Sequence, residues 1–233
     1  MIGFYNYTMV LTYMSLISAS MGIICALNGN GHPFIGCFFL MFSGLCDAFD
    51  GKVARTKKNR TTTEKEFGIQ IDSLSDLVAF GVLPACIGIA MMKRYPYFSG
   101  MFTENHGWQN STPACRALTI LCITVIVLYV LAALIRLAYY NVTEQERQQT
   151  EEGDRKHFVG LPVTTSALIF PFILLLHYIL PADVTPIYIA AVFITGFLFL
   201  FRFKVPKFGL KGVLALVGIG IVEFILLIIL DII

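Results

Sequence analysis

Charged residues are scarce in this sequence. Asp, Glu, Lys and Arg make up only 14% of its 233 residues, whereas 57% of them are hydrophobic. Soluble globular domains carry about 25% charged residues, so the composition excludes a soluble enzyme and indicates an integral membrane protein. The apolar runs are continuous and close to 20 residues long rather than alternating with polar residues. This pattern favours membrane-spanning helices over a β-barrel.

The sequence also lacks the usual signals of disulfides, zinc sites, a signal peptide and repeats. The six cysteines stand singly, without paired spacing or a neighbouring histidine, so they predict packing residues rather than disulfides or a zinc site. The first apolar run lacks a basic region before it, so we expect a retained span rather than a cleavable signal peptide. There is no internal repeat, no low-complexity tract and no separate soluble domain. One compact helical bundle is therefore expected, and nothing in the composition points to a nucleic-acid partner.

Seven apolar segments follow one another along the chain and predict an all-α, polytopic bundle of about seven transmembrane helices. The third contains Pro84, which is expected to kink it. The polar segments Lys93–Pro113 and Thr143–His157 are expected to be loops. The seven spans are Thr8–Leu27, Phe34 to about Val53, about Ile69 to Met92, Arg116–Tyr139, about Leu161 to Leu180, Ile187–Phe201 and Gly212–Leu230.

Lysine and arginine are distributed unevenly between the two sides of this bundle. With the amino terminus inside, the inner loops hold thirteen of them and the outer side holds three. This positive-inside bias orients the loop between the second and third spans towards the cytoplasm. No organelle-targeting signal is visible, so a multi-pass protein of the plasma membrane is expected.

The few acidic residues in the spans gather around that cytoplasmic loop. Asp47 and Asp50 are three residues apart in the second span, and Asp72 and Asp76 are four apart in the third. These spacings put each pair on one face of a helix. The basic segment 57–60 is too polar to enter lipid, so the chain turns there. Two antiparallel helices should then bring the four carboxylates together at the membrane edge.

Such a cluster has a functional and a structural interpretation. Ionisable groups at membrane depth are costly and usually mark function, and crowded carboxylates repel one another unless a cation neutralises them. An all-oxygen cluster suits Mg²⁺ or Mn²⁺. A single Asp near a helix end is more often a cap or a surface charge. Caps do not explain four aspartates in register beside Gly51 and Ala54, which leave one helix face bare.

The motif Asp47-x-x-Asp50-Gly51-x-x-Ala54-Arg55, then Gly68-x-x-x-Asp72-x-x-x-Asp76, resembles the signature of the CDP-alcohol phosphotransferases. Three further stretches resemble the membrane-embedded phosphatidylserine synthases within that family. They are Asp72–Ala85, Ala133–Val142 and Phe158–Pro162. The resemblance covers most of residues 1–180. It implies one transmembrane catalytic domain over residues 1–233, with a six-helix core in 1–202, an additional span in 203–233, and a homodimer.

The resemblance also implies a reaction. The phosphatidyl group of CDP-diacylglycerol would pass to the hydroxyl of L-serine, releasing CMP. Asp47, Asp50, Asp72 and Asp76 would hold the divalent cation, Mg²⁺ or Mn²⁺, which would neutralise the diphosphate. Asp76 would also accept the proton of the serine hydroxyl as the catalytic base.

Other residues have predicted binding roles. Gly51, Ala54, Arg55 and Gly68 are expected to contact CDP-diacylglycerol, although Arg55 is equally expected as an anchor at the inner leaflet. Two residues are candidates for serine binding, namely Arg136 inside the fourth span, which would hold the carboxylate, and Asn141 near the inner edge of the same span. Arg136 is alternatively a structural partner of an aspartate.

Two other functions compete with this prediction. The same chemistry with inositol phosphate or glycerol 3-phosphate as acceptor would need a dedicated cationic pocket. A cation-coupled transporter would place its carboxylates near the bilayer midplane and show repeated halves, neither of which the sequence indicates.

Overall fold

The computed structural model describes residues 3–94, 112–150, 157–180, 182–206 and 210–232. Most of the expected outer loop Lys93–Pro113 lies outside these residues. In chain order the elements are η1 (Tyr7–Met9), α1 (Val10–Leu27), α2 (Pro33–Thr56), α3 (Thr62–Asp76), η2 (Leu77–Val82), α4 (Leu83–Arg94), α6 (Pro113–Thr150), β1 (His157–Val159), η4 (Val163–Thr165), α7 (Ser166–Ile179), α8 (Thr185–Leu200), β2 (Lys204–Pro206) and α9 (Leu210–Ile232).

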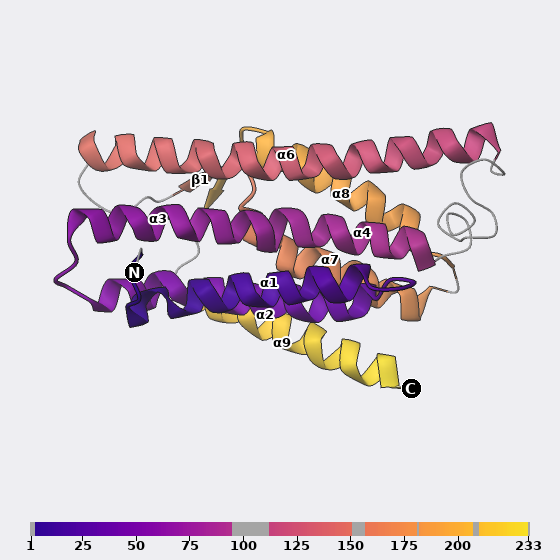
Figure 1. The fold of residues 1–233 in the computed structure, drawn as a ribbon, viewed down its shortest axis with the longest axis horizontal. Helices are drawn as coiled ribbons and strands as arrows, with labels where there is room; N and C mark the ends of the chain where they lie inside the picture. The colour runs from indigo at the N-terminus through magenta and orange to yellow at the C-terminus, as the bar shows by residue number, and fades with distance from the viewer. Residues whose placement is uncertain (1–2, 95–111, 151–156, 181, 207–209, 233) are drawn as a thin grey trace.

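The predicted bundle of membrane-spanning helices is confirmed. Four helical stretches of the described chain are long and apolar enough to cross a bilayer, namely Tyr7–Leu27, Pro33–Thr56, Thr62–Arg94 and Pro113–Arg147. Three shorter apolar helices complete it, at Val163–Ile179, Thr185–Leu200 and Leu214–Leu230. The helices run side by side along the long axis of the molecule (Figure 1), with α1 packed on α2 and α4, and α6 packed on α8.

Two predicted helix boundaries are wrong. The third span begins at Thr62 rather than near Ile69, and α6 continues to Thr150 through the segment expected as a loop from Thr143. At the first boundary the Thr61 hydroxyl accepts a hydrogen bond from the backbone N–H of Glu64 at 3.2 Å, which caps the helix. Polar residues with good helix propensity extend both helices beyond their apolar length.

A short pair of strands, which the sequence does not predict, ties together two distant parts of the chain. Strand β1 pairs antiparallel with β2, so that Phe158 lies opposite Val205. Gly160 follows with a φ of 78°. A Cβ there would lie 3.1 Å from the carbonyl oxygen of Phe199, so both the conformation and the close approach require glycine. This pairing fixes the segment 161–165 against the end of α8.

The third span is interrupted just after Asp76. Leu77–Val82 forms a π-helical segment, and the next turn contains Pro84, which has no N–H to donate to the carbonyl of Phe80. The hydroxyl of Tyr129 on α6 donates to that carbonyl at 2.6 Å and also lies 2.9 Å from the hydroxyl oxygen of Ser166. A side chain from another helix therefore supplies the hydrogen bond that the irregular backbone lacks.

Replacing Tyr129 by Phe should destabilise the protein. The ring would still pack against Phe170 and Phe199, but the buried carbonyl of Phe80 would lose its donor. We expect a loss of about 1–3 kcal/mol in the free energy of unfolding, measured by thermal unfolding in detergent. Tyr7→Phe is the matched control, because the Tyr7 side chain is exposed, and should leave stability unchanged. Equal stability of the two variants would contradict the assigned role of Tyr129.

Candidate active site

The core of the site is a group of three carboxylates from two neighbouring helices. Asp47 and Asp50 on α2 and Asp72 on α3 each offer an oxygen, and these oxygens all lie within 4.8 Å of one another. Asp76 is not one of the three. It lies one turn beyond Asp72 and is only 8% exposed. The other three carboxylates are close enough for their charges to act on it. The structure thus brings the two predicted pairs to the same place.

The three-carboxylate group fits a hard divalent cation. Oxygens that ligate Mg²⁺ at about 2.1 Å can lie up to ~4.2 Å apart across the ion. A group within 4.8 Å therefore needs only small side-chain rotations to hold one ion. All donors are carboxylate oxygens, which is the ligand type that Mg²⁺ and Mn²⁺ prefer.

Helix α1 contributes a residue to this site that the sequence did not predict. The hydroxyl of Thr12 donates to the Asp50 carboxylate at 3.4 Å, and the hydroxyl of Ser75 donates to the backbone carbonyl of Thr12 at 3.2 Å. Thr12 and Ser75 are both buried, so they fix α1 beside the carboxylates. A signal was available in the sequence, because Thr8, Thr12 and Ser15 form a polar stripe at helical spacing in an otherwise apolar span.

The residues predicted to contact CDP-diacylglycerol differ in how accessible they are. A Cβ at Gly51 would meet no heavy atom of the described residues within 4 Å, and Arg55 is exposed. The surface at Gly68 is covered, because a Cβ there would lie 2.7 Å from Nη2 of Arg60. Ala54 is half-buried, and its carbonyl oxygen accepts a hydrogen bond from the same guanidinium.

The two predicted serine-binding residues both sit on α6 but contact different parts of the protein. Arg136 is 6% exposed, and its Nε donates to the carbonyl of Leu161 at 3.2 Å. Asn141 donates from Nδ2 to the hydroxyl of Ser73 at 2.7 Å. Because Ser73 is next to Asp72 in the chain, Asn141 contacts α3 at the level of the carboxylates. Arg136 instead supports the loop that lines the cavity described next.

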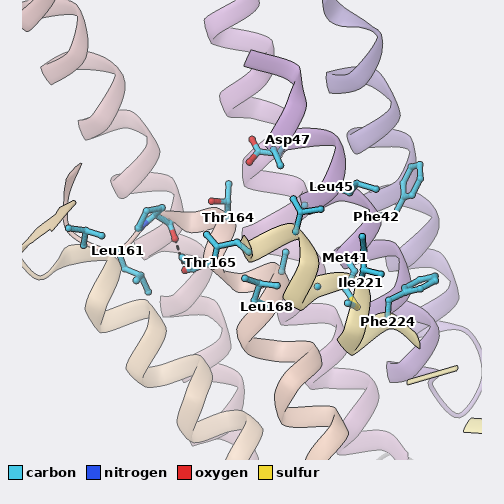
Figure 2. A pocket seen from close by; sticks show the side chains of 18 residues that line it. Met41, Phe42, Leu45, Asp47, Leu161, Thr164, Thr165, Leu168, Ile221 and Phe224 are labelled. Atoms are coloured by element: carbon cyan, nitrogen blue, oxygen red, sulfur yellow. Dashed lines mark hydrogen bonds between the residues drawn. The ribbon is translucent and has the colours of Figure 1, made fainter. Parts of the chain in front are cut away.

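A cavity of about 800 Å³ opens beside Asp47. Its walls come from α2, the segment 161–168, Val205 and α9, and nearly all of them are apolar. Figure 2 shows Asp47 and Thr164 together at one end and Ile221 and Phe224 at the other. The cavity therefore suits an amphiphile whose polar part lies at the carboxylates and whose apolar part extends between α2 and α9.

Comparisons with known proteins agree with this geometry. The family model described as CDP-alcohol phosphatidyltransferase matches residues 5–224. A Helicobacter pylori protein named CDP-diacylglycerol–serine O-phosphatidyltransferase is 26% identical over 203 residues, covering 84% of this chain and 72% of the relative. A Saccharomyces cerevisiae protein of the same name is 35% identical over 146 residues, covering 61% and 43%. An archaetidylserine synthase of Methanothermobacter thermautotrophicus is 28% identical over 156 residues, covering 66% and 53%.

Proposed function

Because this chain belongs to the CDP-alcohol phosphatidyltransferase family, we propose that it transfers the phosphatidyl group of CDP-diacylglycerol to the hydroxyl of L-serine and releases CMP. The acceptor is proposed from the relatives, since the bacterial and yeast proteins are named for serine and the archaeal one for archaetidylserine. The observation that carries the proposal is the apolar cavity that ends at Asp47 in the three-carboxylate group.

The cavity supports a lipid-linked nucleotide as donor. An acyl chain of the donor would lie between α2 and α9, where the walls are apolar. Its diphosphate would then lie at the carboxylates, beside the open surface at Gly51. A water-soluble nucleotide sugar would leave the apolar part of the cavity without a ligand.

The proposed chemistry divides the work among the four aspartates. Asp47, Asp50 and Asp72 would hold the divalent cation, which when bound supplies positive charge against the diphosphate. Asp76 accepts the proton from the serine hydroxyl as its oxygen attacks the phosphorus attached to the lipid. One P–O bond forms to serine and the P–O bond of the diphosphate breaks, so that CMP leaves with the bonding electrons. The proton on Asp76 then passes to solvent.

The proposal includes three further assignments, for serine binding, membrane orientation and assembly. Arg136 and Asn141 would orient serine, with the guanidinium facing its carboxylate. The site would face the cytoplasm of a plasma membrane, on the evidence of the unequal lysine and arginine distribution. A homodimer is proposed by analogy with the family.

An acceptor panel tests the proposed function. Purified protein with CDP-diacylglycerol and Mn²⁺ or Mg²⁺ should release CMP with L-serine and release little with inositol phosphate or glycerol 3-phosphate. CMP release with a phosphorylated acceptor but not with serine would keep the reaction and overturn the acceptor. Cation uptake into liposomes without any CMP release would instead favour a transporter.

A further inference from the structure

Arg60 lies between α2 and α3 and forms no ion pair with the described residues. Its Nη1 donates to the carbonyl of Ala54 at 3.4 Å and its Nη2 to the carbonyl of Glu64 at 3.3 Å. Nε is buried and has no hydrogen-bond partner among the described residues. The nearby Glu64 carboxylate bonds with Lys57 at 2.7 Å and with Asn6. In the part of the chain that the structure describes, the guanidinium pairs with no carboxylate.

The position of Arg60 relates it to the three-carboxylate group. Its guanidinium contacts α2 at Ala54 and lies against α3 at Gly68. Ala54 follows Asp50 by four residues, and Gly68 precedes Asp72 by four. Four residues of helix rise by about 6 Å, so the guanidinium lies roughly one turn from the carboxylates, between the same two helices.

Among the described residues, the Arg60 guanidinium makes two long hydrogen bonds, both to neutral carbonyls. A negatively charged acceptor would form stronger hydrogen bonds with it. The guanidinium carries five N–H donors, of which the structure shows two in use. Phosphate oxygens give shorter, charge-assisted and bidentate hydrogen bonds. Gly68 has no side chain to displace the guanidinium from this position.

We propose that Arg60 is a ligand of the nucleotide diphosphate, which it binds by exchanging the carbonyls of Ala54 and Glu64 for phosphate oxygens. The proposal rests on the proposed function, since it takes a cytidine nucleotide as the ligand of this site. The carboxylates would hold the diphosphate through a cation from one side, and Arg60 would bind it directly from the other. The acceptor alcohol plays no part in this contact.

Equilibrium binding of CDP and cytidine to the full-length protein, in detergent with Mn²⁺, tests the role of Arg60. Arg60→Gln should weaken CDP binding by about 10- to 100-fold, the usual loss for a hydrogen bond to a charged group. It should change cytidine binding by less than about twofold, because cytidine has no phosphate. Arg60→Lys should recover part of the CDP affinity, because lysine keeps the positive charge but lacks the planar guanidinium group that binds phosphate through two hydrogen bonds.

Lys58→Gln is the matched control, because Lys58 is an exposed cation of the same loop; it should bind CDP like the wild type. An equal loss of CDP and cytidine binding in Arg60→Gln would overturn the proposal, since it would indicate that Arg60 only stabilises the conformation of the loop between α2 and α3. Unchanged or tighter CDP binding would overturn it as well. CDP binding needs no acceptor, so a wild type that binds CDP through Arg60 but gives no CMP with serine would refute only the proposed acceptor.

Discussion

Asp76→Asn is expected to reduce the rate of CMP release from CDP-diacylglycerol and serine by about 10²- to 10⁴-fold, the usual contribution of a positioned general base. Asparagine has nearly the shape of aspartate but cannot accept the proton of the attacking hydroxyl. Asp76 is buried one turn from Asp72 and is not among the three carboxylates whose oxygens lie within 4.8 Å. Its loss should therefore lower kcat while the KM for CDP-diacylglycerol changes by only a few-fold.

The matched control for this substitution is Asp183→Asn. The side chain of Asp183 accepts a hydrogen bond from the backbone N–H of Thr185 at 2.8 Å, just before α8, and asparagine forms such a bond to the residue two positions on as aspartate does. That variant should keep wild-type activity and stability. If folded Asp76→Asn retains more than about a tenth of the wild-type rate, the assignment of a general base is wrong. A loss confined to KM would indicate a substrate-binding role instead.

The carboxylate site could be predicted because its information is local. The intervals from Asp47 to Asp50 and from Asp72 to Asp76 fix which face of each helix they occupy, and the basic segment 57–60 forces the two helices to be neighbours. Thr12 could not be assigned in the same way. Its hydrogen bond to Asp50 depends on how α1 packs on α2, and a hydroxyl in an apolar span has many possible partners.

The remaining differences have separate causes, namely helix propensity that hydropathy does not measure and contacts that the local sequence does not specify. Hydropathy measures how far a helix can extend through lipid, but α3 and α6 continue into water because their polar ends still favour helix. The pairing of Phe158 with Val205 joins strands 47 residues apart, and nothing in either segment specifies the other. The position of Arg60 over Gly68 is set by the fold of a loop, whereas the sequence alone predicted that this glycine contacts CDP-diacylglycerol.

Removing the divalent cation is expected to abolish CMP release altogether. The diphosphate would then meet three carboxylates within 4.8 Å of one another, and their charge would repel the donor rather than hold it. Activity in excess EDTA should fall to background and return on titration with Mn²⁺ or Mg²⁺. Asp72→Asn removes one ligand and should raise the metal concentration for half-maximal activity at least as much as loss of an outer-shell partner does, about 10- to 100-fold.

The thermal stability of the same variant separates a metal site from a merely acidic cluster. In EDTA, Asp72→Asn should unfold at a higher temperature than the wild type, because the substitution relieves repulsion among the three crowded carboxylates. With saturating Mn²⁺ the order should reverse, because an ion that binds only the folded state stabilises the protein by an amount that rises with the logarithm of its affinity, and the variant binds the ion more weakly. Glu66→Gln, which removes an exposed carboxylate from the same helix, should follow the wild type in both conditions. If Mn²⁺ does not raise the unfolding temperature of the wild type, the three carboxylates do not form a metal site.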